Sequence, residues 1–372
     1  MQEKKIIAML GGGQLGLMFT EKAQMMGEKV LILDPDPDCP AGKIADKFIN
    51  ADYSNIEALK IIIDNCDVCT TEFENIPYKT LEILEKKIKV FPNSGALRIS
   101  QNRTLEKEFL NELNIPIAEY YEINSADQLE LLKNINNWPY ILKTSTFGYD
   151  GKGQTIVNNF NELKESFGEQ NTNDFVLEEK VSLKKEVSQV AACYNDEIVF
   201  LPISENIHIN NILHKSLVPA SISQNSIKII KDITEKISKN LCYKGILCIE
   251  FFIDKNDKIL VNEIAPRTHN SGHYSIEGCN VSQFEHQVKI LTNQKPIHST
   301  LISSSVMLNL LGDLWSKGIP DFSEANKKNI FLHLYNKNEA KNGRKMGHIT
   351  IMDNTLTASN NKAEELFKNF NL

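Results

Sequence analysis

Apolar residues in the first 95 positions form short continuous runs that alternate with stretches of helical spacing. Short buried runs are typical of strands in a parallel sheet, and apolar positions three or four residues apart are typical of helices. The runs lie at 4–10, 29–34, 67–73 and 88–93, and the helical patterns at 17–27, 55–65 and 77–87. Strands that alternate with helices predict an α/β domain at 1–95, with a parallel sheet covered by helices.

After residue 95, the predicted strands follow one another more closely. A charged amphipathic pattern first predicts one helix at 98–116, closed before Pro116. The predicted strands lie at 140–157 (two strands around a glycine loop), 175–181, 185–203 and 245–267, then at 303–312, 329–336 and 347–353 before a helical tail. This succession indicates an α+β arrangement with little parallel character. We predict three domains: 1–95, 96–298 with a smaller lid subdomain at about 115–182, and a small β-rich domain at 299–372.

Composition narrows the class of protein. The chain has 372 residues, of which 41% are hydrophobic and 24% charged, as in an ordinary globular protein with two or three cores. A net charge of −7 and the lack of a long apolar run argue against binding to nucleic acid or membrane. Seven cysteines in apolar segments are typical of buried thiols in a reducing cytoplasm. The spacing of Cys66 and Cys69 is the one found in redox-active cysteine pairs and in metal sites. The sequence has no second pair of this kind, so we interpret these two cysteines as buried thiols as well.

A glycine-rich turn follows the first predicted strand and opens the first helix, with the spacing Gly11-x-Gly13-x-x-Gly16. Glycines permit a tight turn, and the free N–H groups of the following helix N-terminus bind anions, typically a phosphate. Together with Asp34, the spacing is compatible with the dinucleotide site of an NAD-dependent oxidoreductase. A site for another phosphate and a tight turn without a ligand are the alternatives.

The segment 140–157 holds a second candidate phosphate site. Lys143 lies on a predicted strand directly before a basic loop that contains Gly148, Gly151 and Gly153. A lysine before a glycine-rich loop is a common arrangement for nucleotide phosphates, with the ammonium as a point charge and the loop as a lid. The segment lacks the Gly-Lys-Ser/Thr end of a P-loop, and an exposed hairpin with a basic tip is the alternative.

Two carboxylates are predicted to face each other on a β-hairpin. The apolar runs on either side of Asn256-Asp257 indicate the hairpin, because these residues tolerate the positive φ of a tight turn. With a two-residue loop, Ile253 pairs with Leu260 and Glu250 with Glu263. Like charges among apolar neighbours cost stability unless a cation lies between them, and oxygen ligands suit Mg²⁺ that bridges protein and substrate phosphates. An exposed pair without a ligand is the alternative.

Two further segments carry candidate ligand-binding side chains. Arg267, His269 and His273 lie in the stretch RTHNSGH, whose Asn-Ser-Gly centre indicates a loop, and we favour anion or substrate binding there over a zinc site. A basic cluster near the C-terminus of this acidic protein is a third candidate phosphate site, with a solvated hairpin tip as the alternative. The cluster comprises Lys337, Lys341, Arg344 and Lys345.

Taken in order, these segments resemble the motifs of the ATP-grasp family. The matching stretches are GGGQLG, EFENIP, QNRTLEK, FGYDGKGQ, ENIH, CIEFF, NEIAPRTHNSGH and GRKMGHI, which run nearly from end to end of the chain. Their order is most similar to that of the bicarbonate-using branch, which carboxylates 5-aminoimidazole ribonucleotide through carboxyphosphate in purine synthesis. The resemblance implies a Rossmann-like pre-ATP-grasp domain, an ATP-grasp domain and a small C-terminal domain, in a cytoplasmic enzyme that forms a homodimer.

The resemblance also implies which residues hold ATP and a metal ion. The phosphates would lie against Arg103 and Lys143 under a lid at 148–154, adenine against the backbone of 178–181, and the ribose hydroxyls against Glu186. Glu250 and Glu263 would hold Mg²⁺ or Mn²⁺. The full set expected at ATP is Arg103, Lys143, Gly148, Tyr149, Asp150, Gly151, Lys152, Gly153, Gln154, Glu178, Glu179, Lys180, Val181, Glu186, His208, Asn262 and Glu263.

For the ribonucleotide, the resemblance implies a second set of contacts. It comprises Gln14, Leu15, Glu72, Glu74, His269, Asn270, Ser271, His273, Lys337 and Arg344, of which the last two would hold the phosphate. Asp150, Lys152 and Arg267 would be catalytic. We expect Asp150 to accept a proton from the reacting amine or to orient it.

The chain departs from the family pattern at Thr268, where Pro is usual, at Asn336, where Gly is usual, and at Lys341, where Arg is common. Lys341 makes one phosphate contact less secure because Lys cannot bind bidentately. An alternative within the family is formate-dependent glycinamide ribonucleotide transformylase, although that enzyme usually carries Glu where Gln14 stands. An NAD-dependent oxidoreductase and a nucleotide-binding regulator without turnover are the alternatives from other classes.

Overall fold

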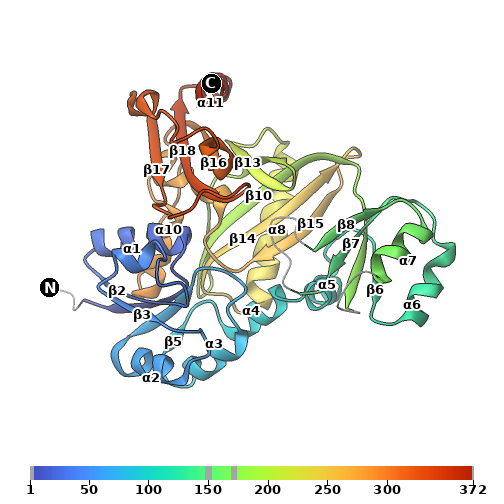
Figure 1. Ribbon diagram of the computed structural model, residues 1–372, viewed down its shortest axis with the longest axis horizontal. Coiled ribbons are helices and arrows are strands. Elements are labelled where there is room, and N and C mark those ends of the chain that lie inside the picture. The colour runs from blue at the N-terminus through green and yellow to red at the C-terminus, as the bar shows by residue number, and fades with distance from the viewer. Residues whose placement is uncertain (1–3, 147–152, 169–173, 371–372) are drawn as a thin grey trace.

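A computed structural model describes residues 4–146, 153–168 and 174–370 (Figure 1). Its N-terminal part is a parallel five-stranded sheet in the order β3-β2-β1-β4-β5, as the alternating pattern predicts. The elements are β1 (Ile6–Leu10), α1 (Gln14–Met25), β2 (Lys29–Asp34), β3 (Lys47–Asn50), α2 (Ile56–Asn65), β4 (Val68–Thr71), α3 (Tyr78–Glu85) and β5 (Lys89–Val90). Strand β3 lies outside the prediction, because this edge strand has only two apolar residues.

Helices cover both faces of this sheet. Ile7 and Met9 of β1 pack against α1 and against α10 (Gln283–Leu291), whereas Ala8 and Leu10 pack against α2 and α3. This alternation follows from the two-residue period of a strand. Helix α10 comes from much later in the chain and also contacts β10 and β14 of the central sheet, so it ties the two parts together (Figure 1).

The prediction of one helix at 98–116 is wrong. The chain forms two helices there, α4 (Ser94–Ser100) and α5 (Arg103–Glu112). Asn102 separates them, because its extended backbone and its side chain, which accepts the N–H of Leu105 at 3.1 Å, begin a new helix. The break makes Arg103 the first residue of α5.

An antiparallel sheet forms the centre of the molecule and its C-terminal part, in the order β15-β14-β10-β12-β13-β16-β18-β17, with β11 paired to β10. Its strands are β10 (Leu183–Tyr194), β11 (Glu197–Phe200), β12 (Ser204–Ile209), β13 (Ile212–Val218), β14 (Gly245–Asp254), β15 (Ile259–Ala265), β16 (Ser304–Leu311), β17 (Ile330–Leu334) and β18 (Lys345–Asp353). Because β13 pairs with β16, the C-terminal strands continue the central sheet. Helices α8 (Gln224–Asn240) and α11 (Leu356–Phe370) pack against the central and C-terminal strands respectively.

A smaller antiparallel sheet, in the order β6-β9-β7-β8, forms the body at the right of Figure 1. It contains β6 (Tyr120–Ile123), β7 (Tyr140–Thr144), β8 (Gln154–Val157) and β9 (Phe175–Glu179), with α6 (Ala126–Leu131) and α7 (Phe160–Gly168). These elements lie inside the range predicted for the lid subdomain, so we call the sheet the lid sheet and its elements the lid. A role as a lid and the exact domain boundaries stay predictions. Among the described residues, no helix combines the length and the apolar character that crossing a membrane requires.

Candidate active site

A cleft of about 880 Å³ lies where the N-terminal, central and lid sheets meet. Side chains from every part of the chain line it, although they are far apart in the sequence. The predicted site residues that line it are Gln14, Leu15, Glu72, Glu74, Arg103, Lys143, Gln154, Glu178, Glu179, Lys180, Val181, Glu186, His208, Glu250, Asn262, Glu263, Arg267, His269, Asn270 and Lys337. The fold therefore brings most of the described candidates together.

Glu250 and Glu263 lie opposite each other on β14 and β15, as predicted, but they reach this pairing by a different route. The turn is longer than two residues, and Ile253 pairs with Ile259, one position away from the predicted partner. A β-bulge at Asn262 then inserts one extra residue into β15 and brings the two carboxylates opposite each other. The predicted pair is confirmed, whereas the predicted register near the turn is wrong.

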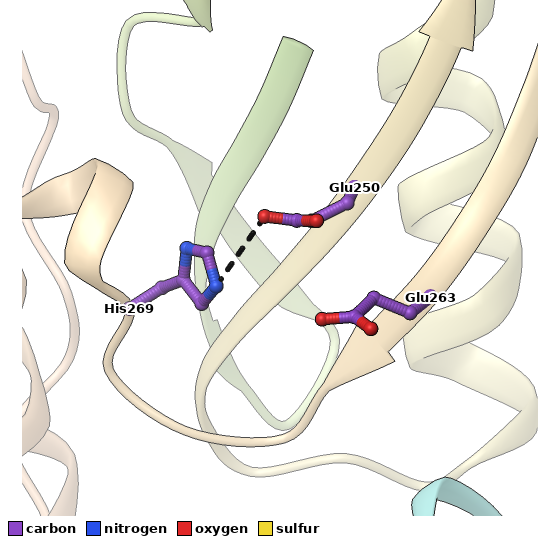
Figure 2. A group of neighbouring side chains, drawn as sticks. All are labelled: Glu250, Glu263 and His269. Carbon is purple, nitrogen blue, oxygen red and sulfur yellow. Dashed lines mark ion pairs between the residues drawn. The ribbon is translucent and has the colours of Figure 1, made fainter. Parts of the chain in front are cut away.

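The two carboxylates and His269 form one group, whose potential ligand atoms lie within 4.8 Å of one another (Figure 2). Removal from bulk water raises the pKa of both carboxyls; Glu263 raises that of Glu250 further, and Glu74 that of Glu263. Asn262 Nδ2 lies 3.5 Å from Glu250 Oε2. Each of these two acids makes ionisation of the other less favourable, and an amide lies next to them. A bound cation would stabilise the ionised form of both acids.

His269 is oriented by its own loop. The backbone N–H of Ser271 donates to His269 Nδ1 at 3.3 Å, and Ser271 Oγ lies 2.7 Å from the same nitrogen. Since Nδ1 accepts, the ring proton lies on Nε2, which is 3.5 Å from Glu250 Oε1. Burial lowers the pKa of His269 well below its usual range, so the ring is neutral. His269 therefore presents an N–H donor to Glu250 rather than a free nitrogen to a metal ion.

Cations line the wall of the cleft formed by β7, β9 and α5. Arg103 Nη1 donates to the carbonyl of Thr144 at 2.8 Å. Lys143 Nζ and Lys107 Nζ lie 2.7 Å and 3.1 Å from the two oxygens of Glu178. Burial alone would raise the pKa of Glu178, but the two ammonium groups outweigh it and lower the pKa to about 2. Two ammonium groups on one carboxylate leave a net positive charge, which suits phosphate.

The segment 178–181 continues from the end of β9 and lines the cleft beside an acid–histidine pair. His208 Nδ1 of β12 lies 2.5 Å from Glu186 Oε2 of β10. Burial would lower the pKa of His208, but the hydrogen bond and charge of Glu186 raise it. A ligand at this end of the cleft meets backbone groups on one side and a charged pair on the other.

The glycine turn that opens α1 holds a carboxylate of the protein itself. Glu72 accepts the N–H of Gly13 at 2.5 Å and the N–H of Leu15 at 3.0 Å. Gly11 has a φ of 102°, and a Cβ there would come within 2.6 Å of Glu72 Cβ. The expectation that these N–H groups are free for a phosphate is wrong, because Glu72 is the anion at this helix N-terminus.

Asp34 is also engaged with its own chain. Its Oδ2 accepts the N–H of Gly12 at 2.7 Å and the hydroxyl of Tyr53 at 2.9 Å, and its Oδ1 accepts the N–H of Asp36 at 2.7 Å. A dinucleotide needs a free helix N-terminus for its pyrophosphate and a free carboxylate for its ribose. Glu72 and Asp34 leave neither, so the structure gives no support to an NAD site.

The remaining wall combines an ion pair with a buried amide. Arg267 binds Glu74 through Nε and Nη2. Asn270 is 7% exposed, and neither its Nδ2 nor its Oδ1 has a hydrogen-bond partner among the described residues. Buried side-chain amides are nearly always paired, so this one indicates a ligand. Lys337 Nζ donates to Gln14 Oε1 at 2.7 Å and links the C-terminal part to the glycine turn.

Four predicted site residues among those described do not line the cleft: Gly153, Ser271, His273 and Arg344. Arg344 Nη1 donates to the carbonyl of Glu339 at 3.1 Å, and Lys341 pairs with the same residue at 3.1 Å, so this part of the basic cluster turns away. Asn336 has a φ of 52°, a left-handed conformation that Asn tolerates in place of the usual Gly. Gly148, Tyr149, Asp150, Gly151 and Lys152 lie outside the described residues.

Two buried charged residues of α5 were missed by the sequence interpretation. Glu106 accepts the N–H of Ile264 at 2.6 Å, and burial together with the neighbouring Glu263 raises its pKa to about 8. Lys107 is the second cation on Glu178. Charged residues on an amphipathic helix are usually solvated, so the pattern gave no warning. The available signal was their position in the QNRTLEK stretch, three and four residues after Arg103.

The cysteines take no part in the cleft. All seven are free thiols. Cys66 and Cys69 are both buried, and burial raises the pKa of each thiol. Neither is activated as a nucleophile or metal ligand.

Comparison with known protein families matches all three parts of the chain. Residues 4–101 match the ribonucleotide synthetase preATP-grasp domain, residues 108–284 the ATP-grasp domain, and residues 305–362 the phosphoribosylaminoimidazole carboxylase C-terminal domain. The curated N5-carboxyaminoimidazole ribonucleotide synthase of Staphylococcus aureus (strain COL) is 39% identical over 366 residues, which cover 98% of this chain and 96% of that protein.

Solved structures give the same result. The N5-carboxyaminoimidazole synthetase from Staphylococcus aureus complexed with ADP has a TM-score of 0.91 and 38% identity, and the match covers 100% of this chain and 98% of that one. The Aspergillus clavatus N5-carboxyaminoimidazole synthase in complex with ADP and 5-aminoimidazole ribonucleotide has a TM-score of 0.90 and 29% identity, with coverage of 100% and 99%. Because the similarity in sequence and structure extends over the whole length, the chain belongs to the N5-carboxyaminoimidazole ribonucleotide synthase family of ATP-grasp ligases.

Proposed function

We propose that this enzyme carboxylates 5-aminoimidazole ribonucleotide with ATP and bicarbonate, and releases N5-carboxyaminoimidazole ribonucleotide, ADP and phosphate in de novo purine biosynthesis. The observation that carries the proposal is the composition of one cleft. A cationic wall around Lys143 and a pair of carboxylates, Glu250 and Glu263, lie next to a second wall with the unpaired amide of Asn270. The Aspergillus clavatus relative holds ADP and the ribonucleotide together, which supports two adjacent substrates here.

In this proposal ATP lies between the lid sheet and the central sheet. Arg103 and Lys143 contact its phosphates, and the backbone of 178–181 holds adenine. Two lysines hold the side chain of Glu178, which fixes the position of the first residue of the segment 178–181. Glu186 accepts from the ribose hydroxyls, and His208 keeps its carboxylate oriented. Gln154 of β8 pairs with Lys143 of β7 and borders the part of the cleft that holds the phosphates in this proposal.

Mg²⁺ or Mn²⁺ fits the paired carboxylates in this proposal. Burial and neighbouring carboxylates raise the pKa of Glu250 and of Glu263, and the cations nearby do not offset this effect. Carboxylate and amide oxygens are the ligands of a hard divalent cation. Asn262 adds an amide at the bulge. When bound, the ion would be held by Glu250 and Glu263 and would supply positive charge at the ATP phosphates.

The ribonucleotide occupies the opposite end. Asn270 can donate and accept through its amide, and His269, whose Nε2 points at Glu250, lines the same end of the cleft. Lys337 and Arg344 bind the phosphate, which requires Arg344 to leave the Glu339 carbonyl that it contacts in this structure. Further contacts come from residues of the glycine turn and the loop after β4: Gln14, Leu15, Glu72 and Glu74.

The reaction has two steps. An oxygen of bicarbonate attacks the γ-phosphorus of ATP, and ADP leaves, which gives carboxyphosphate. Lys143 and Arg103 offset the negative charge that gathers during this transfer. The 5-amino group then takes the carboxyl carbon, either from carboxyphosphate directly or from the CO₂ that it releases; phosphate departs and the nitrogen loses a proton. Carboxyphosphate hydrolyses readily, so an enclosed cleft between the three sheets protects it from water.

An ADP-release assay tests the proposal. We expect release to depend on bicarbonate and on 5-aminoimidazole ribonucleotide together, and formate with glycinamide ribonucleotide to give none. Turnover with formate instead would support the transformylase, and NADH binding without ADP release would support an oxidoreductase. A chain that binds ATP but releases no ADP with any of these substrates would be a regulator.

Two properties of the family complete the proposal. We expect the enzyme to act in the cytoplasm, where its seven free thiols stay reduced. We also expect a homodimer, whose mass light scattering on the purified enzyme would measure; a monomer at working concentration would contradict this expectation.

A further inference from the structure

Gln283, the first residue of α10, lies behind the loop that carries His269 and Asn270 and is fully buried. Its carboxamide makes two hydrogen bonds with the backbone of a cleft residue. The N–H of His269 donates to Gln283 Oε1 at 2.8 Å, and Gln283 Nε2 donates to the carbonyl of His269 at 2.8 Å. The side chain thus pairs with His269 as a neighbouring strand would, and holds both backbone polar groups of that residue.

The orientation of this amide is fixed by its partners. A backbone N–H can only donate and a carbonyl can only accept, so Oε1 and Nε2 cannot be exchanged. The second hydrogen of Gln283 Nε2 points to His273 Nδ1 at 3.2 Å, which must accept it. His273 is fully buried, and burial lowers its pKa well below the usual range. The N–H of Gln283 that points at Nδ1 places the single proton of the neutral ring on Nε2. His273 therefore supports Gln283 from behind the cleft.

The rest of the loop is built around the same side chain. A Cβ at Gly272 would lie 2.7 Å from Gln283 Oε1, so only glycine leaves room for the amide. The backbone N–H of Gln283 donates to Ser275 Oγ at 3.0 Å, and that hydroxyl donates to the carbonyl of Gly272 at 2.6 Å. One residue of α10 thereby holds the loop at three points.

We propose that Gln283 is a positioning residue for the ribonucleotide end of the cleft: it clamps the His269 backbone so that His269 Nε2 points at Glu250 and the Asn270 amide stays in the cleft. The inference rests on the proposed function, because it assigns His269 and Asn270 to the ribonucleotide. Gln283 touches no substrate itself. Both cleft groups leave the chain at or next to the clamped peptide units, so loss of the clamp displaces both.

The test is Gln283→Glu, which keeps the shape and replaces the donor Nε2 by an oxygen. Two acceptors then face each other at the His269 carbonyl unless the new carboxyl is protonated. We expect KM for the ribonucleotide to rise about 10-fold or more, because displacement of the loop weakens the hydrogen bonds of its cleft groups, and KM for ATP to change less than about 2-fold. Lowering the pH from 8 to 6 should restore part of the loss relative to the unmodified enzyme, because a protonated carboxyl can donate again.

Gln287→Glu is the matched control. Gln287 lies one turn later on α10 and is 4% exposed; its Oε1 accepts the N–H of Ile246 at 2.7 Å, and its Nε2 donates to Thr70 Oγ1 at 2.9 Å. The same acid is thus buried in the same helix, away from the loop. We expect both variants to lower Tm by similar amounts and only Gln283→Glu to raise KM for the ribonucleotide. Equal KM values in the two variants would overturn the inference.

Amide hydrogen exchange separates this inference from the proposed function. The His269 N–H should exchange faster in Gln283→Glu than in Gln287→Glu, whatever reaction the enzyme catalyses, and equal protection would overturn the clamp. If the unmodified enzyme released no ADP with ATP, bicarbonate and 5-aminoimidazole ribonucleotide together, the proposed function would fail. Hydrogen exchange would still show whether Gln283 clamps the His269 backbone. Should the acid prevent folding, Gln283→Met and Gln287→Met provide the same comparison without a buried charge.

Discussion

Glu250 and Glu263 face each other on neighbouring strands, although the strands change register between this pair and the turn. The bulge at Asn262 gives β15 the extra residue that brings the second carboxylate into place. Two like charges held at the floor of a cleft destabilise the protein until a cation or a proton neutralises them. Removal of one of the two carboxylates should therefore lower the activity and raise the stability of the metal-free enzyme.

Glu263→Gln should lower the rate of ADP release by more than about 100-fold. It removes one of the two carboxylates that hold the divalent cation at the ATP phosphates in the proposed function. The same change should stabilise the metal-free enzyme by up to about 1 kcal/mol, since a like-charge cross-strand pair is relieved. Thermal unfolding in EDTA and the ADP assay measure the two effects. Glu197→Gln, on the partly exposed strand β11, should change neither, and a lower Tm for Glu263→Gln would contradict the assignment.

The pH dependence of stability should carry the same signature. The pKa of Glu250 and of Glu263 is raised above 4.5 in the folded protein, mainly by removal from water. The folded state then binds more protons than the unfolded state above that pH, so this contribution to stability is complete below pH 4.5 and is lost as pH rises through the raised values. Tm of the metal-free enzyme should fall over this range, and the Tm increase caused by Mg²⁺ should grow with pH. An increase that is independent of pH would exclude these acids as ligands.

The sequence was sufficient for the N-terminal sheet apart from its edge strand β3, because buried parallel strands and amphipathic helices have distinct periods. It predicted the Glu250–Glu263 pair for an incomplete reason, since two deviations compensate: a longer turn and a bulge at Asn262. Neither leaves a periodic signal. The break at Asn102 was readable in principle as a helix N-cap, but the amphipathic pattern continues across it and hid the boundary.

Long-range contacts set the other limit. Glu72 binds the N–H groups of a turn that lies 59 residues earlier in the chain, and nothing in the local pattern of either segment indicates this contact. Lys107 is similar, because a lysine on a charged helix predicts exposure until its partner Glu178 is known. The types and order of the residues predicted which segments contain functional side chains. The partner of each charged side chain could be identified only from the folded structure.

Lys107→Met should weaken ATP binding without affecting the ribonucleotide. Lys107 is 3% exposed and shares Glu178 with Lys143. Its loss leaves Lys143 as the only cation on that carboxylate among the described residues, and Glu178 then draws Lys143 away from the phosphates. We expect KM for ATP to rise about 10-fold, the equivalent of about 1.4 kcal/mol. The protein should also lose about 1–3 kcal/mol of stability, as is usual when a buried partner is removed.

The control for this change is Lys164→Met. Lys164 pairs with Glu130 at 2.7 Å in the lid, and the two side chains are 60% and 50% exposed. Exposed pairs contribute little, so KM for ATP and Tm should stay at their original values. A rise in KM for the ribonucleotide equal to that for ATP in Lys107→Met would show general loosening of the lid and would contradict the specific role of Lys107.

Replacement of Glu72 tests whether the glycine turn is a filled anion site. Glu72→Ala removes the carboxylate that accepts from Gly13 and Leu15, which should cost about 1–3 kcal/mol because buried N–H groups lose their acceptor. Glu57→Ala, at an exposed position in the first turn of α2, should cost less. Sulfate should then raise Tm of Glu72→Ala more than that of the unmodified enzyme, because an external anion can reach the vacated N–H groups. An equal sulfate effect in both proteins would mean that the turn does not bind anions, and Glu72 would be there for packing alone.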